Sequence, residues 1–294
     1  MRRPDQILEC PLCGKAPVRL WHRQGPWTVV RCRGCGLLRT WPPPDRATLA
    51  SFYGSGDYYQ HRNMGAASEA AWVDRTREII ESLPRRPASV LDFGAGEGHL
   101  VHALRQRGLE AEGVEPFPTG RQAARERYGI ELFEEPPAHR RFDLVTLIHA
   151  LEHVADPVAT LARLAERLEP KGLVFIEVPN AASVDMHRSS KRRELLDLPV
   201  HLFHFAPPTL ARVVEKAGLQ ALDLRLSNPD LLEWLLARRA SRPAPRPTSP
   251  PSAASPPPEA ASPSILRASW RRLLPWLRQR LPGDRIQVVA ARAE

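Results

Sequence analysis

Cysteine is scarce in this chain of 294 residues, and all four cysteines lie within the first 35 positions. This distribution excludes a disulfide framework that cross-links the whole molecule. No uninterrupted apolar run is long enough to cross a bilayer, and no apolar segment follows the N-terminal Met-Arg-Arg-Pro-Asp-Gln. We therefore expect neither a membrane span nor a secretory signal, and we expect a cytoplasmic protein.

Acidic residues are sparse near both ends of the sequence. Residues 1–41 carry eight basic and two acidic side chains, and residues 238–285 carry ten and two. Residues 42–237 are mildly acidic, with 23 basic and 28 acidic side chains, although the whole chain has a formal net charge of +9. Because nucleic-acid binding requires positive charge clustered on the binding domain, we expect no nucleic-acid partner.

The sequence does contain an apolar strand pattern that runs directly into a glycine-rich turn. The turn reads Asp92-x-Gly94-x-Gly96-x-Gly98, and a helix pattern follows it. Glycine lets the backbone approach a ligand closely, and the start of a helix offers unpaired N–H groups. This combination favours a ligand with a polar end.

An acidic residue follows at the end of the next apolar strand. Glu115 lies 23 residues after Asp92, and a carboxylate at this spacing suits a ribose diol. Together the turn and the acid predict a nucleoside-containing ligand. A tight turn without a ligand is one alternative. A dinucleotide site is another, although its third glycine comes one residue later than here.

Strand and helix patterns alternate along the rest of the central region. Such alternation predicts a parallel sheet that is covered on both faces, with ligands at the carboxyl ends of the strands. The predicted strands cover residues 88–93, 111–115, 130–133, 142–148, 172–178, 219–226 and 285–294.

The Asp-x-Gly-x-Gly-x-Gly turn is followed by Glu-His-x-x-Asp-Pro, Leu-x-Pro-x-Gly and Glu-x-Pro-Asn segments. This series, within residues 87–226, resembles the class I S-adenosylmethionine-dependent methyltransferases. The resemblance implies an α/β, Rossmann-like sheet of seven strands with the final strand antiparallel. It also implies S-adenosyl-L-methionine as the methyl donor.

In that family the first acid and the glycine turn hold the methionine end of the donor, and the second acid holds its ribose. The residues just after the fourth strand line the methyl-donor pocket. The resemblance thus implies cofactor-binding roles for Asp92, Phe93, Gly94, Ala95, Gly96, Gly98, Glu115, Pro116, His149 and Ala150.

The cysteines form two Cys-x-x-Cys pairs with eighteen residues between them, and a glycine follows each pair. Two such knuckles predict a structural Zn²⁺ site of four thiolates. A segment of ~40 residues buries too little core to fold alone, so zinc would supply the missing free energy. Disulfides or free thiols are the alternative. The predicted ligands are Cys10, Cys13, Cys32 and Cys35.

A ribbon of this kind ahead of a methyltransferase domain resembles a subgroup that includes deoxysugar C-methyltransferases. The resemblance implies that the tyrosine-rich stretch after the ribbon lies over the cofactor site. Tyr58 is therefore a candidate for contact with donor or acceptor. Packing of the ribbon onto the main domain is the alternative role for this ring.

Two histidines beyond the fifth strand are candidates for a general base, because imidazole titrates near neutral pH. These are His201 and His204, and packing in the core is the alternative for each. The subgroup carries a Glu-His pair here, whereas Val200 occupies the Glu position, which argues against carbon methylation. Glu152 and His153 have no second cluster in the sequence to complete a metal site, so we expect no metal there.

The domain organisation follows from these segments. A proline-rich stretch at 243–263 predicts a disordered linker, and a basic amphipathic helix at 265–282 suits either an anionic membrane surface or packing on the core. The predicted units are a zinc ribbon at 1–41, a linker and helix over the cofactor site at 42–86, the core at 87–228, an insertion at 229–284 and the final strand at 285–294.

We therefore expect transfer of a methyl group from S-adenosylmethionine to a small molecule, a sugar or a glycan. One alternative is a non-catalytic protein that binds the donor, and binds a partner through its ribbon and basic segment. A nicotinamide-dependent oxidoreductase of similar architecture is another. The acceptor, the atom that is methylated and the oligomeric state stay open.

Overall fold

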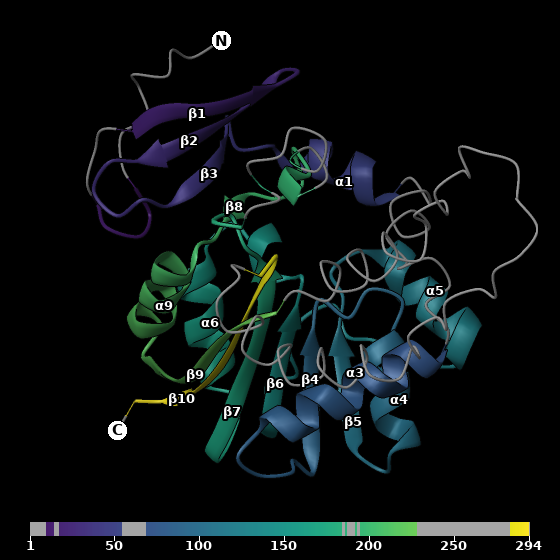
Figure 1. Cartoon of the computed structure of the whole chain (residues 1–294). Coiled ribbons are helices and arrows are strands. Elements are labelled where there is room, and N and C mark those ends of the chain that lie inside the picture. The colour runs from purple at the N-terminus through teal and green to yellow at the C-terminus, as the bar shows by residue number, and fades with distance from the viewer. Residues whose placement is uncertain are drawn as a thin grey trace, which may run out of the picture.

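A computed structural model of the chain is shown in Figure 1. It describes residues 10–14, 18–54, 69–183, 186, 192, 195–227 and 283–293, without the side chains of 69–71. The expected linker at 243–263, the expected helix at 265–282 and Tyr58 lie outside the described residues. Within the described ranges, no helix combines the length and apolar character needed to traverse a bilayer.

The larger sheet is mixed and has the strand order β5-β4-β6-β7-β10-β9. Neighbouring strands from β5 to β7 run parallel, whereas β10 runs antiparallel between β7 and β9, as expected for the final strand. Its strands are β4 (Ser89–Phe93), β5 (Glu110–Val114), β6 (Phe142–Ile148), β7 (Leu168–Pro179), β9 (Leu219–Ser227) and β10 (Arg285–Arg292).

Two hydrophobic clusters cover the two faces of this sheet. Alternate residues of β4 face opposite ways, so Leu91 belongs to one cluster and Val90 to the other. Helices α6 (Pro157–Ala165) and α9 (Pro207–Lys216) pack on the first face. Helices α3 (Glu69–Ser82), α4 (His99–Gln106) and α5 (Pro118–Tyr128) pack on the second (Figure 1). Burial on both faces explains why the central strand β6 is almost continuously apolar.

The sheet was expected to have seven strands, but six are present within the described residues. The expected strand at 130–133 is reduced to one isolated bridge, between Phe133 and Val114. Pro136 and Pro137 follow closely, and proline lacks the N–H group needed to continue a ladder. The expected edge strand therefore does not extend beyond this single bridge.

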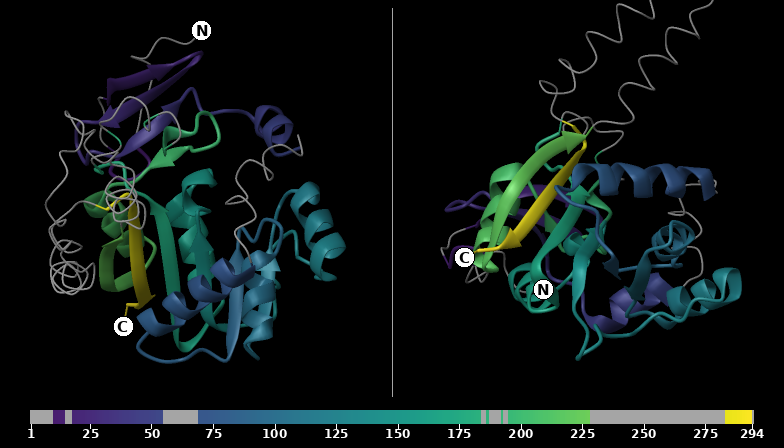
Figure 2. Two further views of the ribbon diagram at one scale, coloured as in Figure 1. Left: turned by 45° about the vertical axis from the view of Figure 1, so that its right-hand side comes forward. Right: turned by 90° about the horizontal axis from the view of Figure 1, so that it is seen from below.

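The four-cysteine module, residues 10–41, forms a second sheet with the order β1-β2-β3-β8. Three of these strands belong to the module: β1 (Val18–Gln24), β2 (Trp27–Cys32) and β3 (Leu38–Trp41). The fourth, β8 (Phe203–His204), comes from the chain beyond β7 and pairs with β3 through Leu38 and His204. Figures 1 and 2 show β1–β3 beside β8, at one end of the larger sheet.

The module also shares a hydrophobic cluster with the core. Cys32 and Leu37 belong to the same buried cluster as Phe203 and Phe205. Helix α1 (Arg46–Gly54) then continues the chain toward the core. The four-cysteine module is thus joined to the rest of the molecule by a shared sheet and shared packing.

Candidate active site

The glycine turn after β4 adopts backbone angles that favour glycine. The φ angles are +80° at Gly94, +54° at Gly96 and +78° at Gly98. A Cβ at Gly94 would lie 2.6 Å from the Cβ of Ala150, which is far inside van der Waals contact. The turn therefore packs directly on the loop that follows β6, and side chains are excluded from this contact.

The second predicted acid meets the turn directly. The Glu115 carboxylate accepts a hydrogen bond from the Gly96 N–H at 2.9 Å and one from the Phe117 N–H at 2.9 Å. Glu115 is only 5% exposed. The structure thus brings together the turn and the acid that the sequence had placed 23 residues apart.

Asp92 lies at the carboxyl end of β4 and is also buried. Its Oδ1 accepts a hydrogen bond from the Thr146 hydroxyl at 2.7 Å. Burial raises the pKa of Asp92 to about 7, the Thr146 hydrogen bond opposes that rise, and the charge of Glu115 adds to it. A cation beside Asp92 would favour its charged form, so this site suits an ammonium group.

His149 and Ala150 follow β6, and the backbone of His149 has a φ of +51°, unusual for a residue with a side chain. The His149 N–H donates to the Glu177 carbonyl oxygen at 2.9 Å. Its ring lies between two buried glutamates, with Nδ1 3.3 Å from Glu152 Oε1 and Nε2 3.6 Å from Glu177 Oε1. The ring itself is 40% exposed.

Glu177 on β7 anchors a charged network. Arg75 of α3 is in direct contact with its carboxylate, Gln287 Nε2 donates to Oε2 at 2.7 Å, and Arg285 Nη1 lies 3.6 Å from Oε1. Burial alone would raise the pKa of Glu177, but the charges of Arg75, His149 and Arg285 lower it below its ordinary value. Glu177 is therefore negatively charged, and its carboxylate lies next to the His149 ring.

A second cluster forms where η2 (Leu151–His153) meets the loop before β8. Glu152 Oε1 lies 3.9 Å from His201 Nε2, and the rings of His153 and His201 are 4.7 Å apart in an edge-on arrangement. The sequence showed no further residue to complete a site with Glu152 and His153, whereas the fold brings a third one to them. His201 joins them, with one ligand-type atom from each residue within 4.8 Å of the others.

His204 is buried on β8, and its Nε2 lies 3.1 Å from the Thr40 hydroxyl of β3. Burial lowers the pKa of His204 to about 3. This ring is therefore neutral at physiological pH and has little tendency to take up a proton.

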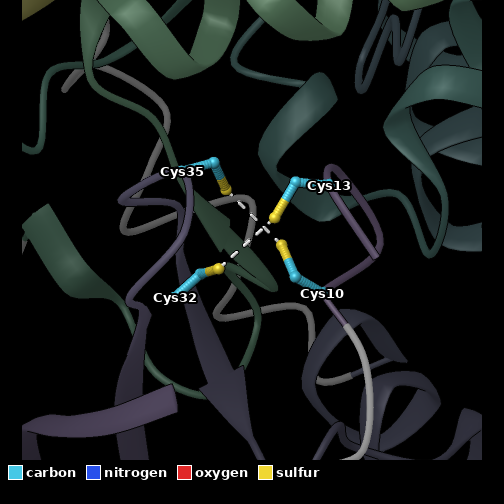
Figure 3. Close-up of side chains that lie close together, drawn as sticks. All are labelled: Cys10, Cys13, Cys32 and Cys35. Carbon is cyan, nitrogen blue, oxygen red and sulfur yellow. Dashed lines mark hydrogen bonds between the residues drawn. The ribbon is translucent and has the colours of Figure 1, made fainter. Parts of the chain in front are cut away.

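The four cysteines of the module converge, as Figure 3 shows. The Sγ atoms of Cys10 and Cys35 are 3.5 Å apart, and those of Cys13 and Cys32 are 3.6 Å apart. All four sulfurs lie within 4.8 Å of one another, and none of the four is in a disulfide. Thiolates around one tetrahedral Zn²⁺ would be about 3.8 Å apart, given Zn–S bonds of about 2.3 Å. The four residues therefore suit a single tetrahedral cation.

Several side chains of this region were not singled out from the sequence. Tyr53 lies in the expected tyrosine-rich stretch, but only the fold shows that its hydroxyl is 2.9 Å from His153 Nδ1. Thr146 sits inside the apolar run of β6, where a lone polar residue was the available signal. Glu177 opens the Glu-x-Pro-Asn segment quoted above, but no role was assigned to it from the sequence. Thr40 gave no signal at all.

Comparisons with known proteins agree on the core. A family model described as a methyltransferase domain matches residues 60–224, just over half of the chain. The ubiquinone biosynthesis O-methyltransferase of Cereibacter sphaeroides is 27% identical over 181 residues, which cover 55% of this chain and 73% of that protein.

Solved structures share the fold at low sequence identity. A methyltransferase in complex with the Haloferax volcanii Trm112 methyltransferase activator gives a TM-score of 0.53 at 17% identity, over 83% of this chain and 98% of that chain. A SAM dependent methyltransferase from Archaeoglobus fulgidus gives 0.51 at 16% identity, over 79% and 98%. With its mixed Rossmann-like sheet and matching residues 60–224, the chain belongs to the methyltransferase domain family, among the class I S-adenosylmethionine-dependent methyltransferases.

Proposed function

We propose that this chain transfers the methyl group of S-adenosylmethionine to a hydroxyl oxygen of a small molecule. The observation that carries this proposal is the direct hydrogen bond from the Gly96 N–H to the Glu115 carboxylate, at the ends of two adjacent parallel strands. Ligands of open α/β sheets bind at such ends. The polar groups at this position match the two polar ends of the donor.

The donor-side roles follow from position and charge. Asp92 and the turn from Phe93 to Gly98 hold the amino-acid end, where a carboxylate and helix-start N–H groups meet an ammonium and a carboxylate. Glu115 accepts from the ribose hydroxyls, next to Pro116. His149 and Ala150 close the pocket behind the methyl group, since Ala150 already packs on Gly94.

His201 is our candidate for the base on the acceptor side. Its Nδ1 lies 3.1 Å from the carbonyl oxygen of Leu195, which can only accept, so Nδ1 carries the proton and Nε2 the lone pair. Nε2 faces Glu152 Oε1 at 3.9 Å and Asp197 Oδ2 at 3.8 Å. These carboxylates stabilise the charged ring after it takes a proton.

The reaction needs little more from the protein than alignment. The acceptor oxygen attacks the methyl carbon, and the carbon–sulfur bond breaks with its electron pair left on sulfur. The hydroxyl proton passes to His201 Nε2. Oxygen as the acceptor atom is supported by the name of the Cereibacter relative, an O-methyltransferase of ubiquinone biosynthesis. Phenols, sugars and glycans all offer such a hydroxyl.

We also propose that Cys10, Cys13, Cys32 and Cys35 hold one structural Zn²⁺. The convergence of the four sulfurs supports this, as does the Gly34 N–H, which donates to Cys32 Sγ at 3.3 Å. A hydrogen bond of this kind favours the thiolate form that binds metal.

Calorimetry with S-adenosylmethionine tests the donor site. E115Q keeps the shape of the side chain and removes its charge, so donor affinity should fall roughly tenfold to a hundredfold. E131Q, at an exposed glutamate that pairs with Arg125, is the matched control and should bind like the wild type. Equal affinity in E115Q and E131Q would contradict the assignment of Glu115.

Turnover needs a separate measurement. Labelled donor is incubated with pools of phenolic and sugar hydroxyl compounds, and products are identified by mass spectrometry. We expect a product one methyl group heavier that depends on His201. Donor binding without any labelled product, across these pools and a cell extract, would instead support a non-catalytic binding protein.

A further inference from the structure

The two histidines on the acceptor side are each held by a residue that comes from the N-terminal part of the chain. We propose that the four-cysteine module and helix α1 complete the acceptor side of the active site, with Thr40 and Tyr53 as positioning residues for His201 and His153. The proposal rests on the proposed methyl transfer, because it assigns partners to the base of that reaction.

Thr40 holds the backbone of the His201 loop. It is 3% exposed, its hydroxyl donates to the His201 carbonyl oxygen at 2.5 Å, and its N–H donates to the Leu202 carbonyl oxygen at 2.9 Å. A threonine hydroxyl has one proton, and a carbonyl oxygen can only accept. The contact at 3.1 Å with His204 is therefore a bond donated by His204 Nε2–H. Thr40 thus contacts His201, Leu202 and His204, and its hydroxyl makes two of these three hydrogen bonds.

Tyr53 holds the second histidine. It lies near the end of α1, is 7% exposed, and stacks on Phe117 with ring centroids 3.9 Å apart. Its hydroxyl is 2.9 Å from His153 Nδ1, which also lies 2.9 Å from the Val200 carbonyl oxygen. Because that carbonyl only accepts, His153 carries its proton on Nδ1, and Nε2 holds the lone pair.

Tyr53 also connects the two sides of the site. Phe117 lies two residues after Glu115 and donates its N–H to that carboxylate. Tyr53 therefore contacts the donor-side loop with its ring and the acceptor-side histidine with its hydroxyl. A residue in this position couples the alignment of donor and acceptor.

The cysteine cluster fixes the strand that carries Thr40. Cys32 ends β2, and its N–H donates to the Leu37 carbonyl oxygen at 2.9 Å. β3 begins at the next residue, Leu38, which pairs with His204. Thr40 lies five residues after Cys35. The position of the cysteine cluster therefore sets the position of Thr40, and Thr40 in turn holds the loop of His201.

Histidine tautomers give a readout that does not depend on knowing the acceptor. Long-range proton–nitrogen correlation spectra of protein with isotope-labelled histidine report which ring nitrogen carries the proton. In the wild type we expect His153 and His201 with the proton on Nδ1, and His204 with the proton on Nε2. T40V keeps the shape of the side chain and removes the hydroxyl, so the His201 and His204 signals should shift and the single His204 tautomer should be lost.

The chain offers matched controls for both residues. Thr28 makes the same kind of bond, from its hydroxyl to the carbonyl oxygen of Trp41, the residue after Thr40, at 2.8 Å. T28V should leave the His201 and His204 signals in place. Tyr128 pairs with His99 Nδ1 at 2.7 Å away from the acceptor side. Y128F should shift His99 and leave His153 in place, whereas Y53F should shift His153.

T40S is the control that distinguishes loss of the hydroxyl from general unfolding, because serine retains the hydroxyl. It should restore the wild-type His201 and His204 signals. Equal perturbation by T40S and T40V, or equal perturbation by T28V and T40V, would overturn the role of Thr40. An unshifted His153 in Y53F would overturn the role of Tyr53.

Calorimetry separates this inference from the proposed function. T40V should bind S-adenosylmethionine within about twofold of the wild type, while its rate of labelled product falls at least about tenfold. If the wild type itself fails to bind the donor, the proposed function fails. If T40V loses donor affinity in step with product, the threonine acts on the whole fold and its positioning role fails.

Discussion

At the scale of single residues, the burial of Asp92 opposes the stability of the fold. A buried carboxyl whose pKa is about 7 instead of the ordinary 3.8 holds its proton more tightly in the folded chain than in the unfolded one. Folding is therefore penalised as the pH rises from about 4 to about 7, and the penalty is constant above that. Its size is about 4 kcal/mol when the shift is converted to free energy.

D92N tests this cost. Asparagine can still accept from Thr146 and never carries a charge, so the variant should melt at a higher temperature than the wild type near pH 8. The difference in melting temperature between D92N and the wild type should shrink toward pH 4. The variant should lose its affinity for the donor at both pH 8 and pH 4. Melting curves across this range, with calorimetry, check both points. A gap that does not change with pH would contradict the raised pKa of Asp92.

Gly94 is the second residue whose identity the fold dictates. G94A should destabilise the protein by more than the ~1–2 kcal/mol that a left-handed backbone costs a residue with a Cβ, because the new atom meets Ala150. G129A is a control with a similar φ of +65° and no atom within 4 Å of a new Cβ. Chemical denaturation measures both variants. Equal losses would show that the contact with Ala150 is unimportant.

At the scale of elements, β8 depends on a partner far away in sequence. Two residues cannot form a stable strand alone, and β8 pairs with β3 of the four-cysteine module. Because the cysteines hold that module, their loss should loosen the loop that carries His201.

The double variant C10S/C13S tests this dependence. It should lose one zinc per chain by elemental analysis, and hydrogen exchange should accelerate in β3 and β8 while β4 and β6 keep their protection. Purified wild-type protein without zinc would dismiss the metal site. Unchanged exchange in β8 would dismiss the dependence.

The elements differ in how well the sequence predicts them. β4 and β6 were predicted closely, because buried parallel strands are apolar runs and the glycine turn marks the end of the first. The strand expected at 130–133 was apolar as well, but the prolines that follow outweigh that signal. β8 could not be predicted, since two residues carry no periodicity and its stability comes from tertiary pairing.

The candidate site also has one part that the sequence predicted and one part that it did not. Glu115 and the turn share a sheet edge by topology, so strand order was enough to predict that they meet. The meeting of Glu152, His153 and His201 depends on a loop path and on a module far away in sequence. No spacing rule contains that information, which is why the third member of this cluster was missed.

At the scale of the whole molecule, Glu177 connects elements from distant parts of the chain. It lies on β7, Arg75 lies on α3, and Arg285 and Gln287 lie on β10. Removing one charge from such a buried group leaves its partners uncompensated.

E177Q should therefore destabilise the protein by about 3 kcal/mol in denaturant unfolding at neutral pH. The pKa of Glu177 is lowered, so its stabilisation is present above the ordinary glutamate range and is lost as the pH falls through the lowered value. The difference from the wild type should thus shrink in acid. E131Q, at an exposed pair, should melt like the wild type at every pH. A pH-independent loss in E177Q would contradict the charge-based explanation.

The β9–β10 hairpin gives the molecule one further property. Ser227 pairs with Arg285, and Asn180 binds the backbone at Gly283 and Asp284, so the chain leaves and re-enters the sheet at neighbouring points. A short turn could therefore join β9 to β10 without breaking the hydrogen-bond ladder between these two strands.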